Sequence, residues 1–139
     1  MALPNVGGGR QFGDGNMNEI VIGVQVAPAT ATVTATLTAA QLATGLLLVS
    51  PGTSACALTL PTGTLMDAAF ANAKVDSSFD FSVVNVDGSS SGAITMTAGT
   101  GWTVNSGGTN SNVLAATTGL VRRYRARRTA AATWTLYPA

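Results

Sequence analysis

Residues 58–86, LTLPTGTLMDAAFANAKVDSSFDFSVVNV, decide the fold, because they read as a strand, a stop, a short helix and a second strand. Around the start of this stretch, Cys56, Leu58 and Leu60 alternate with small or polar residues, which is the period-two pattern of a half-buried strand. Pro61 has no amide hydrogen to donate to a neighbouring strand, so we expect the strand to end there. The rest of the chain is then expected to build a sheet onto this stretch.

A short helix is predicted after the strand. Thr64 with Asp67 three residues later fits a capping box and predicts a helix over residues 65–73, with Met66 and Phe70 on one face. Such a short helix is marginal alone, so we expect it to plug one open end of a sheet layer.

Residues 79–86 give the clearest strand in the chain. Phe79, Phe81 and Val83 are predicted to point to one side, and the residues between them to the other.

The segments before residue 58 add strands and one helical turn. We expect residues 19–26 to be extended up to Pro28, and residues 31–38 to form a strand with Val33, Ala35 and Leu37 inward. A capping box from Thr38 to Gln41 predicts a short helix that ends near Gly45. Pro and Gly at residues 51 and 52 suit a type II turn, which predicts a hairpin that pairs residues 46–49 with residues 55–60.

The segments after residue 86 continue the pattern. Ile94 and Met96 are expected in the core, and short strands are predicted around Trp102 and over residues 113–118. Near the C-terminus, the residues expected to face the core are Leu120, Tyr124, Ala126, Trp134 and Leu136. Many short strands without a long helix predict an all-β fold, namely a jelly-roll-like β-sandwich with one or two short helices.

The domain organisation follows from the same pattern. Residues 29–139 are predicted to form the sandwich, and residues 1–28 an extended N-terminal docking arm. Within the arm, residues 1–18 are rich in Gly and Asn and have almost no periodicity. The arm residues expected to make contacts are Met1, Leu3, Pro4, Val6, Arg10, Phe12 and Met17.

The composition limits the possible functions. Charged residues make up 9% of the 139 residues, compared with about 25% in an ordinary soluble domain, which favours a surface covered by other subunits. The net charge of +1 argues against a general nucleic-acid binder. No apolar run is long enough to span a membrane and no export signal is apparent, so we expect a protein made in a cytoplasm. Cys56 is expected to be a small buried hydrophobe.

Catalysis is not indicated. The chain has no histidine, which excludes triads and metal sites that use histidine. The six acidic residues are scattered, so a two-carboxylate glycosidase stays only a remote alternative. We therefore expect a protein that is not an enzyme and has no cofactor.

The run RRYRARR near the C-terminus is the one charged constellation. It holds five of the seven basic residues and leaves two basic against six acidic residues elsewhere. Three of its arginines share one strand face and would repel one another on a bare surface, so acidic groups of this chain or of a neighbouring subunit should face them. Nucleic acid is a less favoured partner. The predicted subunit interface consists of Arg123, Arg125, Arg127, Asp76 and Asp80, with Asp87 as a further acidic candidate.

A succession of motifs resembles a known family. They are T-x-x-Q-L-x-T-G-L-L-L, L-T-L-P-T, F-D-F-S-V-V-N, I-T-M-T-A-G-T-G-W-T-V, R-x-R-A-R-R-T and W-T-L-Y, which together cover residues 37–137. This pattern is similar to that of the small capsid cement or decoration proteins of bacteriophages, which are trimeric knobs of jelly-roll type.

The resemblance implies a homotrimer on the outer surface of an icosahedral head, with an N-terminal arm on the major capsid protein. Related modules also occur in phage tail fibres. A receptor- or glycan-binding module of a tail fibre is therefore the alternative.

Overall fold

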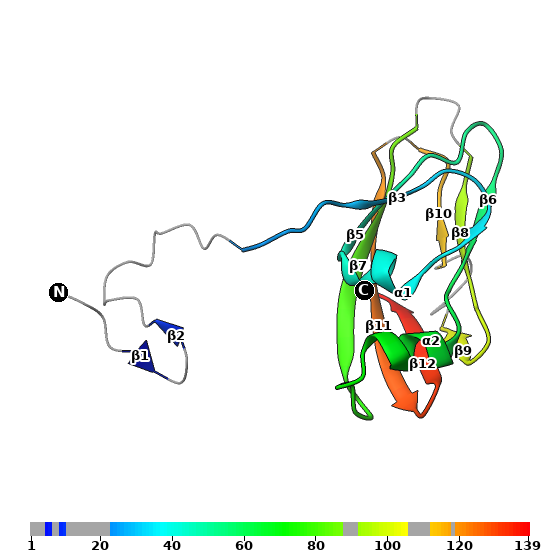
Figure 1. Cartoon of the computed structure of the whole chain (residues 1–139). Helices are drawn as coiled ribbons and strands as arrows, with labels where there is room; N and C mark the ends of the chain where they lie inside the picture. Colours follow the sequence, from blue (N-terminus) through cyan, green and yellow to red (C-terminus); the bar gives the residue numbers. More distant parts are fainter. Residues whose placement is uncertain (1–4, 7–8, 11–22, 88–91, 106–111, 118) are drawn as a thin grey trace.

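The described part of residues 29–139 folds into two β-sheets that face each other (Figure 1). The computed structural model describes residues 5–6, 9–10, 23–87, 92–105, 112–117 and 119–139. The larger sheet has the order β3 (Ala29–Ala31), β5 (Leu46–Val49), β7 (Ser78–Asn85), β11 (Val121–Ala130), β12 (Thr133–Pro138) and β9 (Trp102–Val104). The smaller sheet has the order β10 (Val113–Leu114), β8 (Ile94–Thr97), β6 (Cys56–Thr59) and β4 (Ala35–Thr36). The prediction of an all-β sandwich is therefore confirmed.

The strand connections differ from those of a jelly roll. From β3 to β8 the chain crosses from one sheet to the other at every step, so that β3, β5 and β7 lie side by side, as do β4, β6 and β8. Among the described strands of these two sheets, five pairings are parallel and three are antiparallel. Jelly rolls are antiparallel architectures, so the jelly-roll part of the prediction is not confirmed.

The predicted hairpin of residues 46–49 with residues 55–60 is wrong. β5 lies in the six-stranded sheet and β6 in the four-stranded sheet, so the two strands do not pair. The bend itself is present, and Gly52 has the positive φ of 71° that a type II turn requires. Turn chemistry fixed the reversal of the chain but not the sheet that the second strand joins.

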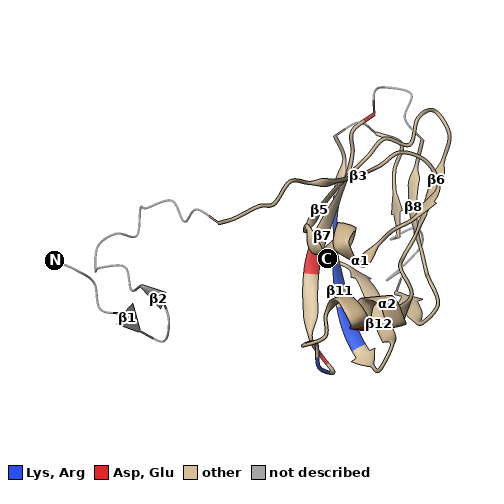
Figure 2. Ribbon diagram, in the orientation of Figure 1, with Lys and Arg blue, Asp and Glu red and all other residues tan. Residues whose placement is uncertain are grey.

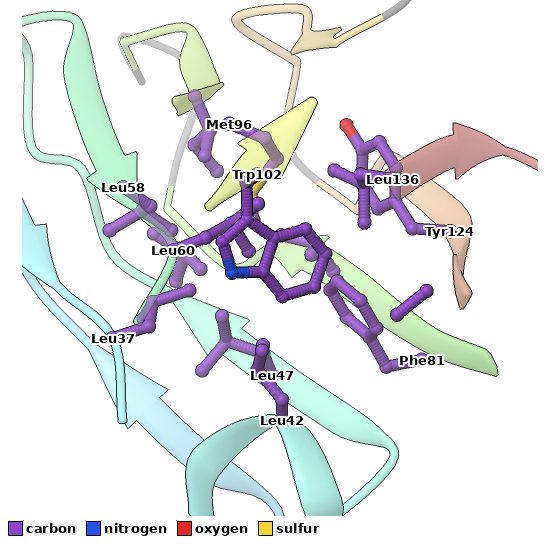
Figure 3. Close-up of a cluster of buried hydrophobic side chains, with 14 of the residues drawn as sticks. Leu37, Leu42, Leu47, Leu58, Leu60, Phe81, Met96, Trp102, Tyr124 and Leu136 are labelled. Carbon is purple, nitrogen blue, oxygen red and sulfur yellow. The ribbon is translucent and has the colours of Figure 1, made fainter. Parts of the chain in front are cut away.

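The core lies between the sheets and contains the predicted alternating residues. Leu58, Leu60, Phe81 and Val83 are at most 2% exposed, and Trp102 lies among these side chains (Figure 3). Its indole Nε1 donates to the Pro61 carbonyl oxygen at 2.6 Å. The other residues that were predicted for the core and are buried are Leu37, Cys56, Ile94, Met96, Tyr124, Ala126, Trp134 and Leu136.

Three inward positions were predicted wrongly. Val33 is 63% exposed and Ala35 is also exposed, because β4 is a two-residue edge strand and only Leu37 reaches the core. Leu120 is 37% exposed because it precedes β11 and escapes the alternation of that strand.

Both predicted helices exist. α1 (Ala39–Ala43) begins with the predicted capping box of Thr38 and Gln41, and Gly45 has a left-handed φ of 74° just after the helix. α2 (Gly63–Ala69) is capped by Thr62 and not by Thr64, and it ends four residues earlier than predicted. The Asp67 carboxylate does not cap the helix but binds groups on β11 and β12 instead.

The helix α2 closes one end of the sandwich beside β9 and β12, which agrees with the predicted plug (Figure 1). Gly63 packs backbone to backbone against the turn between β11 and β12. A Cβ atom at Gly63 would lie 2.0 Å from the Ala132 carbonyl oxygen. Neither helix of the described chain has the length and apolar character needed to cross a membrane.

The N-terminal arm is described only in part. Residues 23–28 run away from the sandwich, are exposed and form no strand, so the extended segment predicted over residues 19–26 is not paired where it is described (Figure 1). Further upstream, β1 (Asn5–Val6) pairs with β2 (Gly9–Arg10) in an antiparallel ladder that the sequence pattern did not predict. Val6 and Arg10 lie in these strands. The other predicted arm contacts lie outside the described residues: Met1, Leu3, Pro4, Phe12 and Met17.

Candidate interaction surface

The outer face of the six-stranded sheet is the candidate site. The side chains of β5, β7 and β11 alternate between the core and this outer face. No described element packs against the outer face (Figure 1). The strand register divides the outer face into a charged half and an apolar half.

The charged half is an arginine ladder, by which we mean Arg123, Arg125 and Arg127 with Asp76 and Asp80. The Asp80 carboxylate accepts from Arg125 Nε at 2.7 Å and Nη2 at 2.9 Å, and also from Arg123 Nη2. Arg127 pairs with Asp76, its Nε lying 3.0 Å from Asp76 Oδ1. Figure 2 shows the positive stretches of β11 beside the negative stretch of β7.

The ladder is held within one chain. The forked hydrogen bonds from Arg125, with a smaller effect of Arg123, lower the pKa of Asp80 to about 2, and Asp80 in turn raises the pKa of Arg125. The arginine side chains of the ladder are 42% to 61% exposed, so water screens the pairs and each contributes little to stability. The expected acidic partners Asp76 and Asp80 are thus confirmed, whereas a location at a subunit interface stays a prediction.

Asp87 does not join the ladder. Its carboxylate accepts a hydrogen bond from the Gly52 amide, and its own amide donates to Asn85 Oδ1 at 3.2 Å. Asp87 therefore fixes the bend between β5 and β6.

The apolar half, which we call the apolar patch, was missed by the sequence reasoning. In register across β5, β7 and β11, Leu48 lies beside Val84, and Val84 lies beside Val121. Val121 is 55% exposed. The signal was present in the runs LLLV and VV, where consecutive apolar residues must place apolar side chains on both faces of a strand. The patch consists of Leu46, Leu48, Val84, Val86 and Val121.

Arg128 points to the opposite side of β11 and has a different role. Its Nε and Nη2 donate to Asp67 at 2.9 and 2.7 Å, and Asp67 also accepts from the Ala132 amide at 2.8 Å and from Trp134 Nε1 at 2.9 Å. These donors, above all Arg128, hold the pKa of Asp67 well below its usual range. Asp67 therefore ties α2 to the turn between β11 and β12.

No model of a known protein family, no curated protein and no solved structure matches the chain.

A shallow hollow lies next to α2. It is lined by Phe70, Asn72, Ser77 and Phe79 together with the edge of Trp134, and the ring centroids of Phe70 and Phe79 are 5.0 Å apart. Trp134 itself is only 1% exposed, so it presents no flat ring to solvent. The half-buried rings of Phe70 and Phe79 therefore provide the aromatic surface of the hollow.

Two of the described carboxylates, Asp67 and Asp80, have pKa values shifted in the opposite direction from that of a general acid. A glycosidase needs a general acid whose pKa is raised, whereas arginine partners lower the pKa values of Asp67 and Asp80. In the described ranges, no three acidic, cysteine or histidine side chains converge to hold a metal ion.

Proposed function

We propose that this chain is a structural virion protein that decorates and stabilises an icosahedral phage head as a homotrimeric cement knob. The observation that carries the proposal is the combination of an uncovered sheet face with an exposed segment, residues 23–28, that leaves the sandwich (Figure 1). A protein that binds a shell needs both a rigid domain and an extended segment that can contact neighbouring subunits. Its partners would be the major capsid protein and other copies of itself.

The mechanism would be binding energy summed over several contacts. In a trimer, docking of one arm raises the effective concentration of the other two arms near their sites. Weak single contacts would then give nearly full occupancy of the outer capsid surface. A chain with only 9% charged residues favours such association, because few like charges oppose it.

The arginine ladder would support the knob. We expect Arg123, Arg125 and Arg127 to lie near the boundary between subunits, where the carboxylates of Asp76 and Asp80 keep them compensated. Forked pairs of this kind set the register of two surfaces more than they add affinity.

The alternative is a receptor- or glycan-binding module of a tail fibre, and the hollow beside Phe70 and Phe79 is the feature that favours it. Burial of Trp102 and Trp134, at 8% and 1% exposure, argues for the cement knob, because neither indole is free to stack on a sugar.

Sedimentation with purified virion parts tests the proposal. Heads stripped of the chain and isolated tails would each be mixed with the labelled protein and pelleted. The proposal expects saturable binding to heads, with a stoichiometry set by the lattice, and none to tails. Saturable binding to tails alone would overturn it and favour the fibre module.

A further inference from the structure

The parallel part of the six-stranded sheet has an apolar side that nothing in the described chain covers. β3, β5 and β7 pair in parallel, and parallel strands normally have both faces covered and read as continuous apolar runs. β5 is such a run, with Leu47 and Val49 fully buried against the other sheet and Leu46 and Leu48 on the outer face. This strand therefore has the composition of one that is buried on both sides.

The neighbouring strands extend the same surface. Val84 and Val86 continue it on and just beyond β7, and Val121 begins β11. Val86 and Val121 are 44% and 55% exposed, although both are apolar. On β11 the patch ends at Val121 and the arginine ladder begins at Arg123, whereas on β5 Leu46 lies in the same row as Arg123, with Ser82 of β7 between them.

Residues 23–26 form an exposed segment that begins close to the apolar patch, and its apolar side chains have a spacing that matches the patch. Val24 is 97% and Val26 is 54% exposed. Two residues apart in an extended chain, they lie about 6.5 to 7 Å from each other. Leu46 and Leu48 on β5 have the same spacing, as do Val84 near the end of β7 and Val86 just beyond it.

A hydrogen bond from Gln25 holds this segment beside the start of β5. Gln25 Nε2 donates to the Thr44 carbonyl oxygen at 2.7 Å, two residues before Leu46. Residues 23–28 extend away from the six-stranded sheet on the side of β5 and β7 (Figure 1). Val24 is 97% exposed, so in this structure it does not cover the patch of its own chain.

We propose that the apolar patch binds residues 23–26 of a second copy of this chain, with Val24 and Val26 seated along Val84 and Val86 and flanked by Leu48 and Val121. Each copy then carries both a donor segment and an acceptor patch, which is a head-to-tail interface that closes into a ring under cyclic symmetry. The inference rests on the proposed function in that it names the surface that joins the copies of the knob. The tests of this inference use the purified protein without virion parts. The inference can therefore fail while the protein still binds heads, and binding to heads can fail while the contact between copies is found.

Disulfide trapping between two differently labelled chains tests the contact. In a Cys56→Ala background, one chain carries Val26→Cys and the other Val121→Cys. Mild oxidation of the mixture is expected to join the two chains, because binding holds the two thiols near each other and the exposed segment can move to the roughly 4.4 to 6.8 Å between Cα atoms that a disulfide spans. Thr97→Cys, exposed on the four-stranded sheet, replaces Val121→Cys in the matched control and is expected to remain unlinked.

Equal yields from the Val121→Cys and Thr97→Cys mixtures would overturn the proposal. A single chain that carries both Val26→Cys and Val121→Cys covers the other possibility. If it closes its disulfide within one chain at high dilution, the arm folds back on its own patch and the second copy is excluded.

Light scattering of purified protein gives an independent measurement. Val121→Asp is expected to weaken self-association by about tenfold or more, since it places an unpaired charge in the contact. The side chain is 55% exposed, so the fold should tolerate the change, and circular dichroism would verify this. Thr97→Asp is the control. Unchanged association of Val121→Asp would contradict the proposal.

Discussion

Replacement of Gly63 by alanine tests how the sandwich is closed by α2. The added Cβ would lie 2.0 Å from the Ala132 carbonyl oxygen and 2.6 Å from the carbonyl carbon, both of which are backbone atoms. Neither side can move easily. The Gly63 amide donates to the Thr100 carbonyl at 2.8 Å, and the Ala132 amide is held by Asp67 at 2.8 Å.

The expected loss follows from these contacts. Overpacking of a well-packed site typically costs about 1 to 3 kcal/mol and occasionally more, and a clash with fixed backbone belongs at the upper end. Alanine would regain about 0.5 to 1 kcal/mol of helix propensity. We therefore expect Gly63→Ala to lower the free energy of unfolding by about 2 kcal/mol, which corresponds to a fall of roughly 6 to 10 °C in Tm.

Urea denaturation followed by tryptophan fluorescence is the assay. Trp102 and Trp134 are both buried, so unfolding changes their emission. With a typical slope of about 1 to 3 kcal/mol per molar urea, the midpoint should fall by roughly 1 M. All variants need the same protein concentration, because association stabilises the folded state by mass action.

Gly23→Ala is the matched control for the fold, since Gly23 lies outside the sandwich and a Cβ there meets nothing within 4 Å; all variants are compared at a concentration below self-association, because residues 23–26 are the proposed contact between copies. Its free energy of unfolding should stay within about 0.5 kcal/mol of the parent. If Gly63→Ala were as stable as Gly23→Ala, the packing of α2 against the turn between β11 and β12 would be refuted.

The remaining predictions concern charge, the thiol and the arm. Because hydrogen bonds from Arg125 lower the pKa of Asp80 to about 2, its stabilising contribution is complete above the ordinary carboxyl pKa of about 3.9 and is lost as the pH falls towards 2. Urea midpoints across this range should fall less for Asp80→Asn than for the parent, and parallel curves would count against the pair. Arg125→Glu places a second carboxylate beside Asp80 and is expected to weaken trimer assembly in light scattering. Salt-dependent loss of shell binding by an intact trimer would instead show that the ladder faces a partner. Burial raises the pKa of the Cys56 thiol, so a thiol reagent should label it in urea but not in the native protein, and rapid native labelling would disprove its burial. Deletion of residues 1–18 should leave the oligomer intact and abolish shell binding, and equal occupancy of shells by both forms would argue against a docking arm.

Local sequence patterns predicted the strands well, because a strand that is buried on one face has apolar residues at every second position. The alternation of Leu58 with Leu60 and of Phe81 with Val83 placed these residues in the core. The capping box at Thr38 likewise predicted α1, since it depends only on neighbouring residues. Short-range chemistry is therefore sufficient for such elements.

Long-range features were harder to predict. The turn at Gly52 is compatible both with a hairpin and with a crossing between sheets, and only the packing of both layers decides between them. The cap of α2 was predicted at Thr64 with Asp67, whereas Thr62 caps the helix and Asp67 binds Arg128 on a distant strand. In the candidate site the arginines were found from their charge, whereas the apolar patch depends on the register of three strands that are distant in sequence.

Immunogold electron microscopy of intact virions tests the central claim most directly. Antibodies against the sandwich, residues 29–139, would be applied to purified particles and the position of the gold recorded. A cement knob predicts many particles of gold over the head and few on the tail. Gold confined to the tail fibres, with bare heads, would contradict the proposed function.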